Sequence, residues 1–306
     1  MTLSAEVTDR LRADDSSFVV TGATGWFGRV TVGLLAEALG GTDRIRCYAS
    51  RDQELTLPGR PVRVRPLEDL RTDDLRTSYL LHYAFVMRDR LECLGLDQYV
   101  SENTAITRAV VSAIGATPPL GLFVTSSGAA RTAATTPYGW LKAVSDDALR
   151  SACRAADVRV LIGRVFAVAG SGNPNPLRYA LSSFADQARR GGPIQVTASR
   201  AVRRSYTGVA DIVALALSDL VLGAQRGTPA DNLFETGGEV VEVGELARRV
   251  ASAAAPGVDV CRPPIDCETE PDDYVGDPAE MLRLMAVHGM VPASLDQLIA
   301  ATLAAP

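Results

Sequence analysis

Apolar runs alternate with apolar-periodic segments along the first half of the chain. The runs predict buried strands near residues 17–21, 44–50, 62–64, 79–82, 120–125 and 158–162. The periodic segments predict helices that end near residues 39, 115 and 156. A strand followed by a helix, repeated with short links, predicts a parallel, doubly wound sheet. We therefore expect an α/β protein.

The regular alternation stops near Gly170, where Ser171-Gly172-Asn173-Pro174-Asn175-Pro176 form a turn-rich segment. Beyond it the pattern predicts helices at 177–190, 211–223, 243–255 and 277–288, and short strands at 194–196 and 232–235. No long linker separates the two halves. We expect a polar leader over 1–16, a first domain over 17–170 that takes in later strand segments, and an intertwined α/β region over 171–306.

A glycine-rich turn connects the first strand to the first helix. Gly22 permits the tight turn, Gly25 lets the backbone approach a pyrophosphate, and Gly28 lets helix and strand pack closely. The helix N-terminus supplies N–H groups and a positive dipole end for phosphates. A purely structural turn would have the same glycines, but the strand–turn–helix context favours a Rossmann-type dinucleotide site. We expect Trp26 and Phe27, within the turn, to contact the cofactor as well.

The end of the second strand predicts which dinucleotide binds. Ser50 and Arg51 stand where this fold meets the adenosine ribose, and a hydroxyl with a guanidinium suits a 2′-phosphate. This pair favours NADP(H). Asp52 follows directly, and an acidic residue at the strand end would instead favour NAD(H).

Two further segments are expected near the cofactor. Asp69 and Leu70 lie in a predicted loop that would flank the adenine. Tyr83, Ala84 and Phe85 follow His82 at the end of the next strand. We interpret His82 as structural, because the sequence offers it no metal or catalytic partners.

Lys142 is the only lysine in the chain, in which the other basic residues are arginines. On a helix it lies one turn from Tyr138, on the same face. An ammonium there lowers the pKa of a tyrosine and makes it a useful acid or base near neutral pH. A surface lysine beside a half-buried tyrosine is the alternative interpretation. Ser127, delivered to the C-terminal end of a buried strand, favours an active site.

Composition excludes several other classes of protein. The net charge is −5, which disfavours a general nucleic-acid surface. The five cysteines form no Cys-x-x-Cys pair and there are two histidines, so we expect no metal site. We expect a cytoplasmic protein without a membrane segment, because no signal peptide and no apolar run of spanning length occur.

Together these motifs resemble the extended short-chain dehydrogenases/reductases, the nucleotide-sugar epimerase/dehydratase/reductase family. The resemblance covers nearly all of the chain after residue 16. It is carried by the glycine turn, His82-Tyr83-Ala84, Asn103, Ser126-Ser127, Tyr138-x-x-x-Lys142, Arg164-Val165-Phe166 and Arg204-Ser205-Tyr206-Thr207-Gly208-Val209-Ala210-Asp211.

The resemblance implies roles for five residues. Tyr138 would be the acid/base, Lys142 would lower its pKa and hold the nicotinamide ribose, and Ser127 would hydrogen-bond the reacting oxygen. Arg204 would bind the substrate diphosphate, for which a guanidinium is chemically suited. Asn173 is expected to contact the substrate.

Departures from the family pattern narrow the reaction. Gly128 and Ala129 stand where 4,6-dehydratases place Asp-Glu, which argues against dehydration. Ala167 replaces an asparagine that commonly contacts the substrate, and the segment from Ser127 to Tyr138 is shorter than usual. The Ser-Gly-Ala stretch followed by Pro-Tyr-Gly is similar to NDP-4-keto-6-deoxysugar reductases.

Three functions are compatible with these observations. The first is an NADPH-dependent ketoreductase acting on a nucleotide-linked 4-ketosugar or a related polar ketone. The second is an NAD-dependent nucleotide-sugar 4-epimerase. The third is a non-catalytic dinucleotide-binding protein, which the intact Ser127, Tyr138 and Lys142 disfavour. The resemblance also implies a homodimer formed through the helices at about 97–115 and 137–156.

Overall fold

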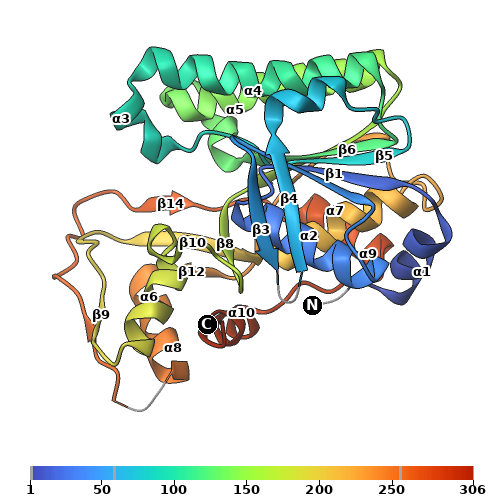
Figure 1. The fold of residues 1–306 in the computed structure, drawn as a ribbon. Helices are drawn as coiled ribbons and strands as arrows, with labels where there is room; N and C mark the ends of the chain where they lie inside the picture. Colours follow the sequence, from blue (N-terminus) through green and yellow to red (C-terminus); the bar gives the residue numbers. More distant parts are fainter. Residues whose placement is uncertain (1–2, 58–59, 255–256, 306) are drawn as a thin grey trace. The chain divides into compact units, whose positions relative to one another are not determined.

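The computed structural model describes residues 3–57, 60–254 and 257–305. The chain forms two compact units. The first comprises Met1–Arg164 and Val213–Phe234, and the second comprises Val165–Ile212 and Glu235–Pro306. Figure 1 shows the elements coloured along the sequence.

An eight-stranded, mostly parallel sheet forms the centre of the first unit. Its strand order is β11-β7-β6-β5-β1-β2-β4-β3. The bounds are β1 Ser17–Thr21, β2 Ile45–Ala49, β3 Gln53–Leu57, β4 Arg60–Pro66, β5 Ser78–His82, β6 Gly121–Ser127, β7 Arg159–Val165 and β11 Asp231–Glu235. β1 pairs in parallel with β2 on one side and β5 on the other. The strand order therefore reverses at β1, and ligands bind beyond the C-terminal ends of strands at such a point.

Helices cover both faces of this sheet (Figure 1). The helices that belong wholly or mainly to this unit are α1 Ala5–Ala13, α2 Trp26–Leu39, α3 Leu91–Leu94, α4 Leu96–Ala116, α5 Pro137–Ala155 and α7 Val209–Leu222, with short 3-10 helices η1 Leu67–Thr72, η2 Arg88–Arg90 and η3 Gly128–Thr135. α4 and α5 contribute Ile114 and Leu149 to a buried cluster with Leu80 and Leu122 of the sheet. The Rossmann-type α/β fold expected from the sequence is thus confirmed.

Several elements of the first unit differ from the sequence-based expectation. Residues 53–57 form an additional antiparallel edge strand, β3, in which only Leu55 is buried, so its apolar signal is weak. The segment around Asp69 is a 3-10 helix and not an open loop. β5 ends at His82, as expected from the sequence, and begins at Ser78. The leader forms the short helix α1 and is not polar throughout, because its Val7 and Leu11 are buried.

The second unit is a smaller α/β assembly. β10 (Val202–Gly208) pairs with β12 (Val240–Glu242), β14 (Asp272–Tyr274) and β8 (Ala167–Ala169), and β9 (Ile194–Gln195) pairs with β13 (Val260–Cys261). Its helices are η4 Pro176–Arg178, α6 Ala180–Arg189, α8 Val243–Ala254, α9 Ala279–Val287 and α10 Leu295–Leu303. Leu181, Leu246 and Leu298, from α6, α8 and α10, meet in one apolar core.

The sequence pattern had not predicted β10 or α10. Arginines and hydroxyl residues interrupt the apolar signal of β10. α10 is short, but a capping box defines its start, because Ser294 accepts from the amide of Gln297 and the Gln297 side chain accepts from Ser294.

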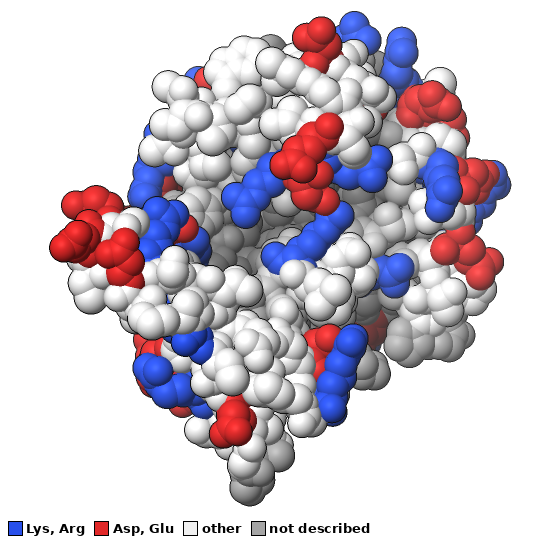
Figure 2. Space-filling model, turned by 90° about the vertical axis from the view of Figure 1, so that its left-hand side faces the viewer, with Lys and Arg blue, Asp and Glu red and all other residues white. Residues whose placement is uncertain are grey.

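Surface charge is mixed. On the face drawn in Figure 2, basic and acidic side chains lie interspersed. Many of them form ion pairs, such as Arg63 with Asp52 and Arg203 with Asp273. None of the helices in the described part of the chain combines the length and apolarity that a bilayer crossing requires.

Candidate active site

The glycine-rich turn between β1 and α2 leaves no room for side chains. Gly22 has a φ of +66°, and a Cβ there would lie 2.7 Å from the amide nitrogen of Ala84. A Cβ on Gly28 would lie 2.4 Å from the carbonyl oxygen of Gly22. Gly25 is the N-cap of α2 and supplies no side-chain cap, so it leaves the first N–H groups of the helix to a ligand. This cradle fits the pyrophosphate of a dinucleotide.

The two aromatic residues of the turn lie differently. Trp26 is buried, and Phe27 is half-buried with its ring centroid 5.7 Å from that of Tyr83. The Tyr83 hydroxyl accepts a hydrogen bond from Thr31. The segment after β5 therefore packs directly against the turn, and both are predicted from the sequence to contact the cofactor.

Asn103 holds this segment in place from α4. Its Oδ1 accepts from the amide of Val86 at 2.9 Å, and its Nδ2 donates to the carbonyls of Val86 and Tyr99 at 3.3 and 3.1 Å. Asn103 is fully buried. The sequence marked this asparagine only through the family resemblance, and its contact with Val86 depends on the tertiary fold.

His82 is a buried neutral residue at the end of β5. Its Nδ1 lies 2.7 Å from the hydroxyl of Thr21, its partner in β1. Burial, and secondly the charge of Lys142, lower the pKa of His82 to about 3. Its contacts agree with the structural role expected from the sequence.

Lys142 lies one turn after Tyr138 near the start of α5, and its side chain is buried (7% exposed). Its Nζ donates to the carbonyl of Thr125 at 2.9 Å and lies 3.9 Å from the ring centroid of Phe85. Phe85 packs edge-to-face on Tyr138, at 5.7 Å between ring centroids. Burial lowers the pKa of Lys142 to about 8, and the charge of Asp146 opposes this shift. A surface lysine is thereby ruled out.

The start of α5 is anchored closely. The side chain of Thr136 caps the helix by accepting from the amide of Gly139 at 3.0 Å. A Cβ on Gly139 would lie 2.5 Å from the carbonyl oxygen of Ala129, so α5 and η3 meet backbone to backbone. This contact fixes where Tyr138 leaves the helix.

Ser127 ends β6 and begins η3. Its Oγ accepts from the amide of Ala129 at 3.2 Å, which makes it the cap of η3. The side chain is buried. η3 contains no Asp or Glu, so no carboxylate directly follows the serine.

The proposed 2′-phosphate residues lie on the surface. Ser50 and Arg51 are exposed in the link between β2 and β3. Asp52, which would favour NAD(H), pairs with Arg63 at 2.9 Å. Its negative charge is thus partly offset, although both groups are exposed and the pair is weak.

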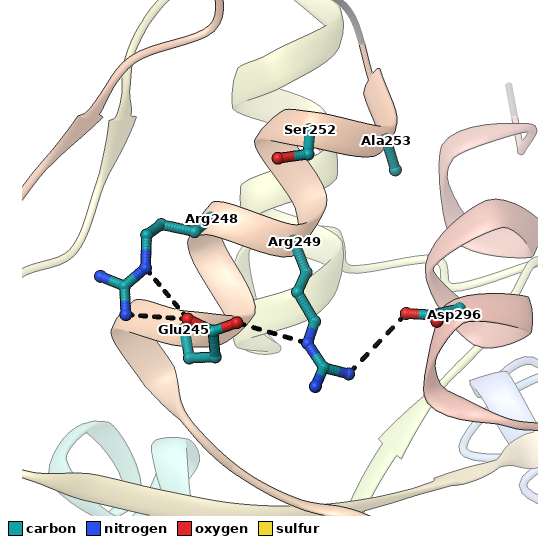
Figure 3. Close-up of a pocket in the computed structure, with 6 residues that line it drawn as sticks. All are labelled: Glu245, Arg248, Arg249, Ser252, Ala253 and Asp296. Carbon is teal, nitrogen blue, oxygen red and sulfur yellow. Dashed lines mark hydrogen bonds and ion pairs between the residues drawn. The ribbon is translucent and has the colours of Figure 1, made fainter.

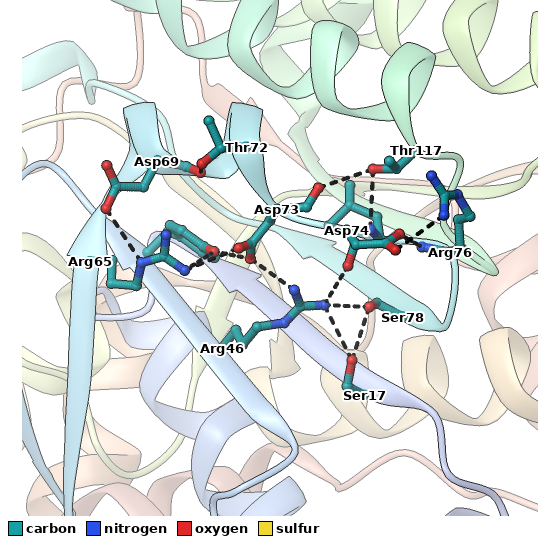
Figure 4. A network of polar contacts seen from close by, with 12 residues as sticks. Ser17, Arg46, Arg65, Asp69, Thr72, Asp73, Asp74, Arg76, Ser78 and Thr117 are labelled. Atoms are coloured by element: carbon teal, nitrogen blue, oxygen red, sulfur yellow. Dashed lines mark hydrogen bonds and ion pairs between the residues drawn. The ribbon is translucent and has the colours of Figure 1, made fainter.

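Asp69 and Leu70 lie in η1, and Asp69 belongs to the polar network shown in Figure 4. Asp69 pairs with Arg65 at 3.3 Å, and Arg65 also pairs with Asp73 at 3.1 Å. Leu70 is fully buried in the core, so only its backbone is available to a ligand. The Tyr48 hydroxyl also donates to Asp73, which ties β2 to η1.

The two expected substrate residues belong to the second unit. Arg204 pairs with Asp272 at 3.1 Å and donates to its carbonyl oxygen at 2.6 Å. Asn173 donates to Ser182 at 3.0 Å and accepts from the amide of Asn175 at 2.9 Å. Both side chains are therefore engaged within their own unit.

The second unit also has an open depression of about 410 Å³ (Figure 3). It is lined by Glu245, Arg248, Arg249, Ser252, Ala253 and Asp296. Its arginines are already paired, Arg248 with Glu245 at 2.8 Å and Arg249 with Asp296 at 3.8 Å. None of the expected site residues lines it, and we assign it no function.

Within the described residues, no group of three or more His, Cys, Asp or Glu side chains is arranged to hold a metal ion. Thr125 and Asp146, which act on Lys142, were not singled out from the sequence. The four-residue spacing from Lys142 to Asp146 was visible there, but the contact with Thr125 requires the packing of α5 on β6.

Comparison with known proteins supports a family assignment. Residues 18–228 match the model of the NAD dependent epimerase/dehydratase family. No curated protein matches the chain by sequence.

Solved structures share the fold at low identity. The epimerase Mth375 from Methanothermobacter thermautotrophicus is 19% identical with a TM-score of 0.74, over 98% of this chain and 94% of that one. MoeE5 in complex with UDP-glucose and NAD is 20% identical with a TM-score of 0.73, over 94% and 97%. A UDP-glucose 4-epimerase from Thermus thermophilus, in complex with NAD, is 18% identical with a TM-score of 0.70, over 94% and 97%. The chain belongs to the NAD dependent epimerase/dehydratase family.

Proposed function

We propose that this protein is an NADPH-dependent ketoreductase that acts on a nucleotide-linked 4-ketosugar or a related polar ketone. The observation that carries the proposal is the environment of Lys142. A buried ammonium, fixed by Thr125 and Phe85, stands one helical turn from Tyr138. Such a cation favours the phenolate and makes Tyr138 a proton donor or acceptor near neutral pH.

The chemistry near Ser127 disfavours the elimination of water. Elimination of water needs an additional acid and base, and η3 provides no carboxylate for them. Tyr138 would deliver a proton to the carbonyl oxygen while Ser127 donates a hydrogen bond to the same oxygen. Ser127 caps η3 in the present structure, so its hydroxyl would have to reorient toward the substrate.

The glycine turn would hold the pyrophosphate of the cofactor, and Ser50 with Arg51 would bind a 2′-phosphate. Such a nicotinamide cofactor supplies hydride transfer. Pairing of Asp52 with Arg63 supports NADPH, because it reduces the negative charge near the phosphate. MoeE5 and the Thermus epimerase were solved with NAD, which supports the alternative cofactor.

Arg204 is proposed to bind the diphosphate of a nucleotide sugar. The guanidinium already shares Asp272, so phosphate oxygens would replace or extend this pair. UDP-glucose in MoeE5 supports the substrate class. Asn173 remains a proposed substrate contact.

The same residues also suit a second candidate, an NAD-dependent 4-epimerase. It would use Tyr138 first as base and then as acid while the cofactor stays bound. The epimerases among the structural neighbours support it.

We also propose that the protein is a cytoplasmic homodimer. All five cysteines are free thiols, which suits a reducing compartment.

The proposed dimer rests on apolar side chains exposed on two helices. α5 exposes Trp140 and Val144, and α4 exposes Leu96. A dimer through these two helices would cover this apolar surface.

The decisive experiment titrates cofactor-free protein with NADPH and NADH, followed by nicotinamide fluorescence. Arg51→Ala should weaken NADPH binding by roughly 10- to 100-fold, the loss of a hydrogen bond to a charged group, and change NADH binding little. Arg76→Ala, an exposed arginine that pairs with Asp74 before β5, is the control. Tyr138→Phe should then abolish NADPH oxidation with NDP-4-ketosugars while cofactor binding persists.

Other outcomes would redirect the assignment. Tightly held NAD(H) in the purified protein, or a preference for NADH, would refute the Ser50–Arg51 argument and favour the epimerase. Unchanged turnover in Tyr138→Phe would refute the catalytic role of the tyrosine.

A further inference from the structure

A buried carboxylate lies behind the Tyr138–Lys142 pair, and the proposed reaction does not use it. Asp146 is 3% exposed and follows Lys142 by four residues on α5, so both lie on one helix face. Its Oδ2 accepts from the hydroxyl of Ser126 at 2.5 Å. Its Oδ1 has no hydrogen-bond partner among the described residues. Burying a carboxylate with one oxygen that accepts no hydrogen bond costs folding free energy, unless its negative charge stabilises a nearby positive group.

Groups on α5 and on neighbouring elements surround this pair. Lys142 and Arg164 of β7 stabilise the carboxylate of Asp146, while Asp147 on α5 opposes them. Lys142 faces His82 of β5, which burial keeps neutral, and Phe85, which is uncharged. Asp146 is the acidic group that raises the pKa of Lys142 against the effect of burial.

We propose that Asp146 is a positioning residue of the active site, whose buried negative charge keeps the ammonium of Lys142 protonated and available to Tyr138. This inference rests on the proposed function for the part that concerns Tyr138. The interaction of Asp146 with Lys142 itself holds whatever substrate the enzyme takes. If Asp146 had only a structural role, its contribution would be the hydrogen bond that it accepts from Ser126, which joins α5 to β6.

The two titrations bracket neutral pH. Burial raises the pKa of Asp146 to about 6, and the pKa of Lys142 is lowered to about 8. Between these values both groups are charged and stabilise each other. Loss of the negative charge would remove the effect that opposes burial, so Lys142 would lose its proton at a lower pH.

The pKa of Lys142 can be measured directly, because Lys142 is the only lysine in the chain. Full-length protein labelled with ¹³C-lysine, and carrying no lysine in any tag, gives a single ε-carbon signal that can be titrated by NMR. Asp146→Asn keeps the size and a hydrogen-bonding oxygen but removes the charge. Asp147→Asn, an exposed neighbour on the same helix, is the matched control.

We expect the pKa of Lys142 to fall in Asp146→Asn by clearly more than in Asp147→Asn, and to recover partly in Asp146→Glu. The alkaline limb of the kcat profile should move to lower pH in the same variant. An unchanged Lys142 pKa in folded Asp146→Asn, or a moved pKa with an unmoved alkaline limb, overturns the proposal.

Wild-type protein supplies a test that needs no folded Asp146→Asn. Its Lys142 signal should show a second inflection near pH 6, caused by ionisation of Asp146. Ser126→Ala should move this inflection to higher pH, because it removes the hydrogen bond that stabilises the carboxylate. Absence of the second inflection overturns the proposal. The titration contains neither cofactor nor substrate, so it stands even if the ketoreductase assignment fails.

Discussion

Replacing Gly28 with alanine would place a methyl group inside the glycine-rich turn. The new Cβ would lie 2.4 Å from the Gly22 carbonyl oxygen and 2.5 Å from the Ala23 Cα. Both are backbone atoms and cannot rotate away, so β1 and α2 would have to separate. Overpacking of this kind costs about 1–3 kcal/mol of stability.

Gly33, in the same helix, is the matched control. Nothing lies within 4 Å of a Cβ built there. Its alanine variant should gain about 0.4–1 kcal/mol, because alanine is the better helix former and restricts the unfolded chain. The two variants should therefore differ by roughly 1.5–4 kcal/mol, although the chemical change is identical.

Urea unfolding followed by circular dichroism measures both variants, and nicotinamide fluorescence measures cofactor binding. Gly28→Ala should unfold at lower urea and bind the dinucleotide more weakly, because the pyrophosphate cradle is distorted. Gly33→Ala should keep wild-type binding. If Gly28→Ala matched Gly33→Ala in both assays, the close packing of the turn would be refuted as the reason for its glycine.

Two other variants test the support of the site. Asn103→Ala should lower the free energy of unfolding in urea by about 1–3 kcal/mol, because the amide of Val86 loses its hydrogen-bond acceptor. Gln98→Ala, on the exposed side of α4, is the control and should change stability little. Equal effects of the two variants would contradict the anchoring role of Asn103. The pKa of His82 is about 3 in the folded protein and 6.5 in the unfolded chain. The unfolded chain therefore binds a proton that the folded protein does not, so stability should fall by on the order of a few kcal/mol as the pH drops from 6.5 toward 3. His82→Gln should flatten that slope in unfolding curves measured across this range, and an unchanged slope would show that another group is responsible.

Local patterns in the sequence determined the central part of the fold. The strand, the glycine triplet and the following helix were predictable because each depends on neighbouring residues: Gly22 needs a positive φ, and α2 needs its apolar period. Tyr138 and Lys142 were predictable as a pair because helix geometry alone places them one turn apart. The family itself followed from these motifs.

Other features depended on residues far apart in the chain. The low pKa of Lys142 arises because β6 and the segment after β5 bring Thr125 and Phe85 around it, and desolvation has no signature in a single segment. The strand β10 was missed because pairing, and not an apolar period, stabilises it. Arg204 shows the same limit, since its partner Asp272 lies on the neighbouring strand β14. The sequence by itself determined which chemical groups are present and their local order, and only the tertiary structure decided which of them are buried together, because burial and charge pairing are properties of packed surfaces.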